Sequence, residues 1–264
     1  MIKIENTEVV GWEHAIRGMR NPMNSWAGSD SGYCGGDNHI GCVHCHFAGD
    51  KEHNEKMIAT DFTYGYDVLL CGKKEFTGKY EIGHKDYELM KKLCNAGTDH
   101  RKFMRMIVVY CDITAPLYWW KEFDTYKVGT VANSCSTMHK IADKEFTEED
   151  FSFNHIIDEV TNSQCYTYRD TEWDAGDVTD LLIGLLNHYR ELYLQTNDKE
   201  YWWQMIHLLP SSYNQKRTVM LNYEVIANMY KSRKNHKLDE WVELMGYFKE
   251  NLPYSELFTG EWGK

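Results

Sequence analysis

Long apolar runs, a basic excess and flexible linkers are all missing from this chain of 264 residues. An apolar run of about 18 residues, which a membrane-spanning helix requires, does not occur. The opening MIKIENTEVV also lacks the basic-then-apolar layout of a secretion signal. We therefore expect a soluble, cytoplasmic protein. The absence of internal repeats, low-complexity tracts and Gly/Ser linkers argues against a repeat array or a string of tethered modules.

Basic residues are few: 29 Lys and Arg stand against 40 Asp and Glu, which gives a formal net charge of −11. Without a long basic stripe the chain lacks the electrostatic footprint of a protein that grips duplex nucleic acid. Any role connected with nucleic acid should therefore be at the level of the nucleotide. The hydrophobic fraction of 42% and the aromatic fraction of 14% supply ample core and argue against disorder.

Periodicity indicates an α+β protein in which helices dominate. We expect an opening strand, then a short helix that ends near Pro22, because a residue before proline avoids the α conformation. The strongest strand candidate is RMIVVYCDI, which is β-branched and aromatic and predicted to be buried. Helices are expected from residue 84 to a stop at Gly97, and in 117–123, 145–162, 174–196, 217–233 and 238–251.

Residues 28–83 differ in composition from the rest of the chain. They are rich in Gly, Asp, His and Cys, and they contain a smaller share of large apolar side chains than the rest of the chain. We interpret this segment as a lobe inserted into a single domain that spans residues 1–264. A lobe with so little apolar material would fold more readily around a metal ion.

A candidate zinc site lies in this lobe. Cys42 and Cys45 form a CxxC pair, and Cys34 precedes them by eight residues. A two-residue gap lets one turn present two thiolates to one ion. The predicted ligands of a structural zinc are Cys34, Cys42, Cys45 and either His46 or Cys71. Two alternatives remain: unligated thiols in a Gly-rich loop, or a redox pair, which lacks the βαβ context that would support it.

The segment HRKFMRMIVVYCDITAPLYWWKEFDTYKVGTVANSCSTMH begins with His100 and places Pro116 sixteen residues later. This layout resembles the core of flavin-dependent thymidylate synthases, in which the signature RHRxxS begins nine residues after the proline. The signature position falls on residues 125–130 of this chain. The spacing is kept, whereas most of the charges are not.

The resemblance implies particular roles for residues near the signature. Tyr126 and Lys127 stand at its second and third positions, and Thr130 keeps the hydroxyl of its serine. A family glutamine that helps to place the substrate falls on Glu122, and Ser136 is retained from the following motif. The implied cofactor contacts are thus His100, Tyr126 and Lys127, and the implied substrate contacts are Glu122, Thr130 and Ser136.

Family arginines that grip a substrate phosphate are missing at three positions, which here carry Thr125, Met138 and Ile206. Bidentate arginines suit a phosphate better than lysine does, since lysine presents a point charge. The cations that could compensate are Lys102, Arg105, Arg101, Lys121 and Arg217. Their number leaves open which of them, if any, binds an anion.

A second stretch, LLPSSYNQKRTVMLNYEVIANMYKSR, resembles the same family independently. A Leu-Pro pair is followed there by two asparagines six residues apart and an arginine five residues later. Asn222, Asn228 and Arg233 reproduce both intervals. The resemblance implies flavin contacts from the asparagines and a substrate contact from Arg233. On a continuous helix Asn222 and Arg233 would share one stripe, roughly 16 Å apart. Polar residues at this spacing also form ordinary solvated faces.

The resemblance covers residues 8–23 and 84–258 and implies an antiparallel sheet flanked by long helices. It also implies a homotetramer with FAD sites at subunit interfaces. Two functions follow as alternatives. One is an FAD-dependent transferase, a methyltransferase of nucleotide biosynthesis that acts on a pyrimidine nucleotide of the dUMP type. The other is a non-catalytic nucleotide-binding or assembly protein.

The pairs Trp119-Trp120 and Trp202-Trp203 are each expected to place one ring in the core and one at an interface.

Overall fold

The computed structural model describes residues 2–33, 80–157 and 165–262, which form two compact units. Unit 1 comprises Met1–Thr7, Tyr110–Val219 and Asn235–Leu244. Unit 2 comprises Glu8–Val109, Met220–Lys234 and Met245–Lys264. A single domain with an insertion at residues 28–83 stays a prediction, because most of that segment lies outside the described residues.

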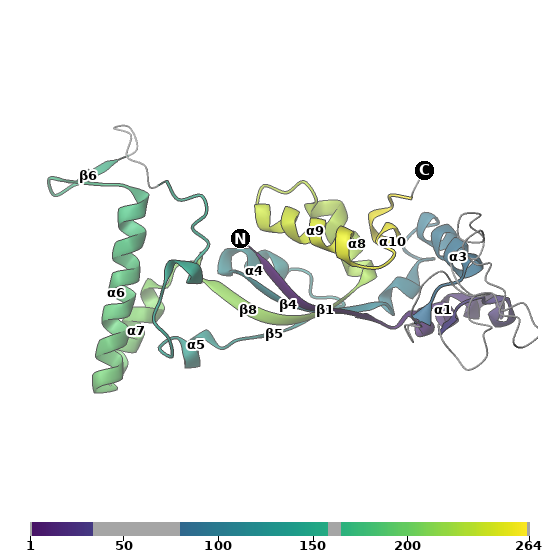
Figure 1. Cartoon of the computed structure of the whole chain (residues 1–264), viewed down its shortest axis with the longest axis horizontal. Helices are drawn as coiled ribbons and strands as arrows, with labels where there is room; N and C mark the ends of the chain where they lie inside the picture. Colours follow the sequence, from purple (N-terminus) through teal and green to yellow (C-terminus); the bar gives the residue numbers. More distant parts are fainter. Residues whose placement is uncertain (1, 34–79, 158–164, 263–264) are drawn as a thin grey trace, which may run out of the picture. The chain divides into compact units, whose positions relative to one another are not determined.

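The first half of the chain forms β1 (Lys3–Val10), α1 (Trp12–Arg20), η1 (Asn21–Met23), η2 (Trp26–Gly28), β2 (Gly32–Tyr33), β3 (Tyr80–Glu81), α3 (His84–Asn95), η4 (Lys102–Arg105), β4 (Val108–Pro116), α4 (Leu117–Phe123) and β5 (Val131–Ser134) (Figure 1). The second half forms α5 (Thr137–Lys140), η5 (Glu148–Asp150), β6 (Tyr166–Tyr168), β7 (Thr171–Trp173), α6 (Ala175–Thr196), α7 (Lys199–Leu208), β8 (Asn214–Asn222), α8 (Tyr223–Arg233), α9 (Asp239–Asn251) and α10 (Glu256–Thr259).

Strands β1, β4, β8 and β5 form a four-stranded sheet in the order β1-β4-β8-β5. The predicted α+β class with an antiparallel sheet is confirmed. In unit 1 strand β4 buries alternate side chains, Cys111, Ile113 and Ala115, whereas Tyr110 is 41% exposed. The sequence-based expectation was a buried strand. The alternation instead shows that it packs on one face and meets solvent on the other.

Helix α4 begins directly after Pro116, as predicted, and both of its tryptophans are fully buried. The centroids of Trp119 and Trp120 lie 4.8 Å apart with an interplanar angle of 75°, and Trp241 lies 4.7 Å from Trp119. The expectation of one core ring and one interface ring is therefore wrong here, because the edge-to-face contact lets both rings enter the core. Trp202 packs against a hydrophobic cluster of unit 1 and Trp203 is half-buried, so the expectation for this second pair stays a prediction.

Helices α6 and α7 lie side by side in unit 1 (Figure 1). A capping box between Asp174 and Asp177 starts α6, and Asn197 ends it with a positive φ of 55°. Both boundaries agree with the sequence-based prediction. Leu186 of α6 and Met205 of α7 meet in a hydrophobic cluster. Other apolar side chains of α6 stay exposed: Val178 (53%), Leu181 (49%) and Leu194 (56%).

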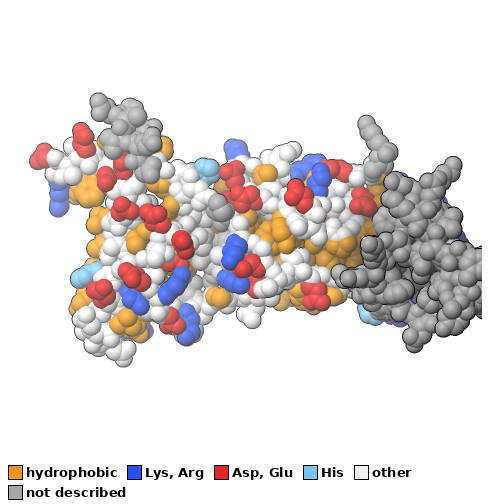
Figure 2. Space-filling view, in the orientation of Figure 1, with side chains coloured by type: hydrophobic (Ala, Val, Ile, Leu, Met, Phe, Trp, Pro, Cys, Tyr) orange, Lys and Arg blue, Asp and Glu red, His pale blue; other side chains and the backbone are white. Residues whose placement is uncertain are grey.

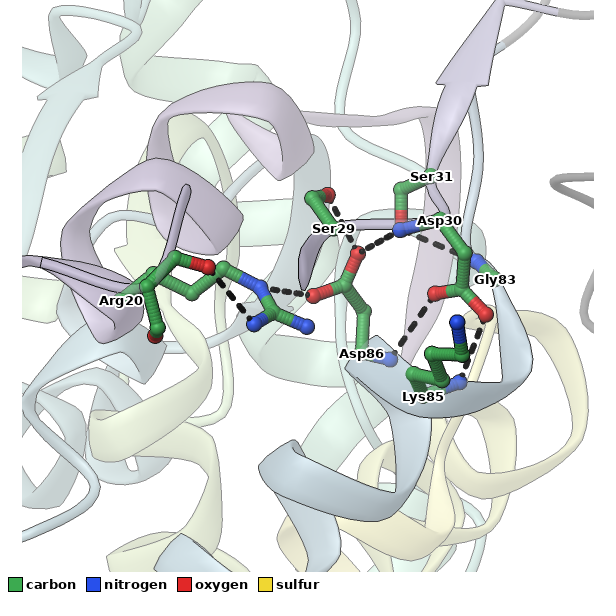
Figure 3. Close-up of polar contacts among 8 residues, drawn as sticks. Arg20, Ser29, Asp30, Ser31, Gly83, Lys85 and Asp86 are labelled. Carbon is green, nitrogen blue, oxygen red and sulfur yellow. Dashed lines mark hydrogen bonds and ion pairs between the residues drawn. The ribbon is translucent and has the colours of Figure 1, made fainter. Parts of the chain in front are cut away.

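A buried polar network organises unit 2 (Figure 3). The carboxylate of Asp86 on α3 is fully buried and accepts from Nε of Arg20 on α1 at 2.6 Å. The hydroxyls of Ser29 and Ser31 each donate to its other oxygen at 2.6 Å. The carboxylate of Asp30 accepts from the backbone N–H groups of Lys85 and Asp86 at the start of α3. This arrangement satisfies a buried charge and an N-terminal helix end together.

The network joins the two chain segments that flank residues 34–79. Strands β2 and β3 pair antiparallel, with Gly32 opposite Glu81 and Tyr33 opposite Tyr80. The backbone N–H of Gly83 donates to Ser31 at 2.9 Å. A Cβ at Gly83 would lie 2.2 Å from the Asp30 carboxylate, so this position requires glycine. The described residues on either side of 34–79 are thus held together in unit 2.

Two predicted helices differ in the structure. Residues 217–222 belong to strand β8, because Val219 and Leu221 are buried on one face while Thr218 is exposed. Of the expected helix over 145–162, the described residues to 157 form only the 3-10 turn η5. The backbone after this turn pairs with another segment instead: Phe151 bridges to Tyr213, and the Ser152 N–H donates to the Ser212 carbonyl at 2.9 Å.

Candidate functional site

The loop after α4 in unit 1 brings together three of the predicted site residues. The hydroxyl of Thr125 donates to the Glu122 carbonyl at 2.7 Å, and the Thr130 hydroxyl donates to the Tyr126 carbonyl. The Tyr126 ring packs against Trp241 with centroids 5.9 Å apart. Glu122, Tyr126 and Thr130 therefore belong to one ordered turn.

The carboxylate of Glu122 is held in place by neighbouring aromatic side chains. The indole N–H of Trp241 donates to Oε2 at 3.0 Å, and Nε2 of His236 lies 3.7 Å from the same oxygen. An ionised carboxylate only accepts hydrogen bonds, whereas the glutamine of the resembled family also donates. Position 122 thus presents a fixed acceptor.

Lys127 and Ser136 lie at the surface of unit 1, and both are exposed. The Ser136 hydroxyl oxygen accepts from the His139 N–H at 3.3 Å, which makes Ser136 the N-cap of α5. Its O–H group is still a donor, because the cap uses only the oxygen lone pair.

In unit 2 the second group of predicted site residues, Asn222, Asn228 and Arg233, lies on α8 and at its N-terminus. Asn222 precedes this helix as its N-cap, and its side-chain oxygen accepts from the Val225 N–H at 3.0 Å. The expected continuous helix through Asn222 and Arg233 is therefore corrected, because Asn222 ends β8. Asn228 is exposed on α8, and Arg233 is its half-buried last residue. Only Asn228 and Arg233 share the helix proper.

His100 lies in an exposed turn before η4, also in unit 2. The next residue, Arg101, forms an ion pair with Glu224 in the first turn of α8, with Nε 2.8 Å from Oε2. The Tyr223 N–H donates to the Ile107 carbonyl at 3.1 Å. These contacts tie the His100 turn to the start of α8. The sequence gives no signal for Glu224, because an acidic residue in a first helical turn is common.

Metal and membrane predictions have separate outcomes. Within 2–33, 80–157 and 165–262, no group of three or more His, Cys, Asp or Glu side chains could hold a metal ion. The predicted ligands Cys34, Cys42, Cys45 and His46 lie outside the described residues, so the zinc site stays a prediction. None of the helices in the described ranges is long and apolar enough to cross a membrane.

Charged side chains are interspersed on the face drawn in Figure 2, where Lys and Arg alternate with Asp and Glu.

Two of the described cysteines have unreactive thiols. Burial raises the pKa of the Cys94 thiol and of the Cys111 thiol to about 12. A thiol with such a pKa is protonated at neutral pH and is a poor nucleophile.

No family model and no curated protein matches the sequence. Solved structures do resemble the fold. Thymidylate Synthase X (ThyX) from Helicobacter pylori, crystallised with FAD and dUMP, matches with a TM-score of 0.56 and 14% identity, over 99% of this chain and 98% of that chain. The UMP/dUMP methylase PolB from Streptomyces cacaoi, bound with 5-Br dUMP, matches with a TM-score of 0.51 and 13% identity, over 99% and 94%.

These similarities run along nearly the whole chain, so the molecule has the fold of the ThyX-type flavin-dependent thymidylate synthases. The resemblance found in the sequence is thereby confirmed at the level of the fold. At 13–14% identity the match establishes the fold.

Proposed function

We propose that this protein is a divergent flavin-dependent enzyme of the thymidylate synthase type. It transfers a hydride or one-carbon unit to a pyrimidine nucleotide such as dUMP. The observation that carries the proposal is a nearly full-length fold similarity to a protein crystallised with FAD and dUMP. The intervals from His100 to Pro116, and through Asn222, Asn228 and Arg233, add independent support from the sequence.

The donor set fits FAD in its chemistry. His100, Asn222 and Asn228 in unit 2 offer imidazole and amide N–H groups, which suit the carbonyl oxygens of a flavin ring. Tyr126 and Lys127 in unit 1 offer a phenol and an ammonium, which suit phosphate oxygens. When bound, the flavin supplies the hydride chemistry. The protein residues then bind the cofactor and fix its orientation.

The proposed substrate contacts comprise one cationic, one acidic and two neutral side chains. Arg233 presents a planar guanidinium that can bind a phosphate in bidentate fashion. Glu122 supplies a fixed acceptor, and the hydroxyls of Thr130 and Ser136 supply neutral hydrogen-bonding groups. Because Trp241 holds the Glu122 carboxylate at 3.0 Å, this acceptor is oriented before a ligand arrives.

The first test is the visible spectrum of the purified protein, followed by fluorescence titration with FAD. We expect a bound-flavin spectrum and weaker binding, by about fivefold, in Asn228→Ala, since one hydrogen bond contributes about 1 kcal/mol. Asn251→Ala is a matched control at an exposed position of α9. A wild-type protein without affinity for FAD would overturn the enzyme proposal.

We also propose a homotetramer. Exposed apolar side chains on α6, among them Val178, Leu181 and Leu194, support association through this helix. Light scattering should give four chains for the wild type and a smaller particle for Leu181→Glu. An unchanged monomer in both cases would remove the assembly proposal.

The alternative is a non-catalytic nucleotide-binding protein on the same fold. It is favoured by the signature turn, where the Thr125 hydroxyl bonds to Glu122 and the Tyr126 ring packs on Trp241. Two of the three positions that bear charge in the resembled family thus serve packing here. Binding of dUMP without any FAD affinity would select this alternative.

A further inference from the structure

Arg217 of β8 is held on an aromatic platform in unit 1. Its guanidinium carbon lies 4.2 Å from the ring centroid of Trp120, and its Nε donates to Oε1 of Gln215 at 2.9 Å. Nη1 donates to Oδ1 of Asp124 at 2.8 Å. The Arg217 side chain is 15% exposed, whereas that of Asp124 is 52% exposed. Nε of the guanidinium is therefore fixed by Gln215, whereas Nη1 is bonded to a carboxylate at the surface, that of Asp124.

The platform beneath Arg217 is rigid. The Trp120 ring is fully buried, and its indole N–H donates to the Gln215 carbonyl at 2.9 Å. The Gln215 side-chain amide donates to the Cys135 carbonyl and to the Thr137 hydroxyl, both at 3.1 Å. A guanidinium stacked in this way loses little further freedom when it binds an anion.

The same contacts place Arg217 beside both predicted substrate segments of unit 1. Asp124 immediately precedes the 125–130 turn, and Cys135 and Thr137 flank Ser136. An anion that binds to Arg217 would therefore lie near the residues to which the proposed function assigns substrate contacts. Nη2 of Arg217 has no hydrogen-bond partner within the described ranges, so the fork has capacity for a second oxygen.

Other cations that could replace the missing arginines are less suited. Arg101 already forms an ion pair with Glu224, and Lys102 and Arg105 are exposed in unit 2. Lys121 is exposed and carries a point charge. Arg217 combines a planar fork, partial burial and an aromatic support.

We propose that Arg217 binds the anionic group of the ligand, with Asp124 as an internal carboxylate that occupies the guanidinium until the ligand arrives. A phosphate displaces Asp124 from Nη1 and also accepts from Nη2, in a bidentate contact. The exchange is feasible because a partly exposed ion pair contributes little. The inference rests on the proposed function in that the ligand class is a nucleotide monophosphate.

Titration calorimetry with dUMP, and separately with inorganic phosphate, tests the proposal through changes of opposite sign. Asp124→Asn should bind either probe about two- to fivefold more tightly, because the competing charge is gone. Arg217→Lys should bind about ten- to a hundredfold more weakly, because it keeps the charge and loses the fork. Circular dichroism melts should establish that both variants are folded.

Matched controls remove a similar group elsewhere in unit 1. Arg190 is half-buried and its Nε donates to the Ala142 carbonyl at 3.0 Å, while Asp143 is an exposed partner of Lys140. Arg190→Lys and Asp143→Asn should leave both affinities unchanged.

The proposal is overturned by equal affinities in wild type and Arg217→Lys, by weaker binding in Asp124→Asn, or by no binding of either probe to wild type and Asp124→Asn. Asp124→Asn is exposed and keeps its shape, so it tests the idea even if Arg217→Lys does not fold. Arg217-dependent dUMP binding without FAD binding would support this inference and reject the proposed enzyme.

Discussion

Arg101 and Glu224 form a two-point ion pair across 123 residues of sequence in unit 2. Nε lies 2.8 Å from Oε2, and Nη2 donates to Oε1 at 3.1 Å. Their side chains are 19% and 9% exposed. Because water reaches both side chains poorly, each charge is stabilised mainly by the opposite charge of its partner. The pair also connects the His100 turn to α8, so that stability and the proposed flavin contacts are linked.

Removing one member of this pair should therefore destabilise the protein. Glu224→Gln is expected to lower the free energy of unfolding in urea by about 3 kcal/mol, since it leaves the half-buried guanidinium of Arg101 without its opposite charge. The double change of Arg101→Met and Glu224→Leu should recover most of the loss. Glu250→Gln, at an exposed position, is the control. A double variant as unstable as the single one would refute the explanation.

The N-cap role of Asn222 can be separated from its proposed flavin contact. Asn222→Ala should cost about 1 kcal/mol of stability through the lost cap to Val225. Asn222→Asp keeps an oxygen at the cap and should retain stability, yet it lacks the amide donor and should weaken FAD binding. Parallel urea and FAD titrations check both effects. Unchanged FAD affinity in Asn222→Asp would confine the residue to capping.

Residues 34–79 should be removable. Tyr33 and Tyr80 are directly paired, so an Asn-Gly turn between them can close β2 and β3 into a hairpin. We expect the shortened chain to melt within a few degrees of the parent. The same deletion combined with Asp86→Ala should fail to fold, because the buried Arg20 then has no carboxylate. Aggregation of the simple deletion would show that the segment belongs to the core.

Stability should fall at alkaline pH. Burial raises the pKa of Cys94 and Cys111 to about 12, above their ordinary value of 9.0. Thiols with a raised folded pKa favour the folded state below pH 9, and that contribution is lost as the pH rises from about 9 toward 12. Cys111→Ala should reduce the slope of unfolding free energy against pH in this window. Cys135→Ala, at an exposed position, should not.

The zinc prediction is checked by elemental analysis. Wild-type protein should contain close to one zinc per chain, and Cys42→Ser should contain much less, since thiolate ligands hold the metal. Cys165→Ser, a change in unit 1, is the control. Zinc-free wild-type protein would leave these cysteines as ordinary thiols.

Local signals predicted much of the fold. The amphipathic pattern of residues 174–196 predicted both ends of α6, and Pro22 predicted the end of α1. The β8–α8 boundary was missed because the polar residues of 214–222 also suit a helix face, and only burial of Val219 and Leu221 reveals the strand. Spacing brought Asn222, Asn228 and Arg233 to attention, but the cap at Asn222 is a matter of backbone geometry.

The pair between Arg217 and Asp124 could not be foreseen in the same way, because the partners are 93 residues apart in sequence. An arginine in a strand and an aspartate after a helix are each ordinary in isolation. Only the folded chain brings them together, with Arg217 lying over the Trp120 ring. Nonlocal charge pairs of this kind carry no periodicity that a sequence could display.

The contact between Trp119 and Trp120 makes unit 1 optically distinctive. Two indoles with centroids 4.8 Å apart, inclined by 75°, couple their excited states and should give a paired band of opposite signs in circular dichroism. Trp12 and Trp262 of unit 2 pack against tyrosines instead. Loss of the indole couplet therefore reports the melting of unit 1 alone. The chain carries an intrinsic spectroscopic probe that can show whether its two units unfold together.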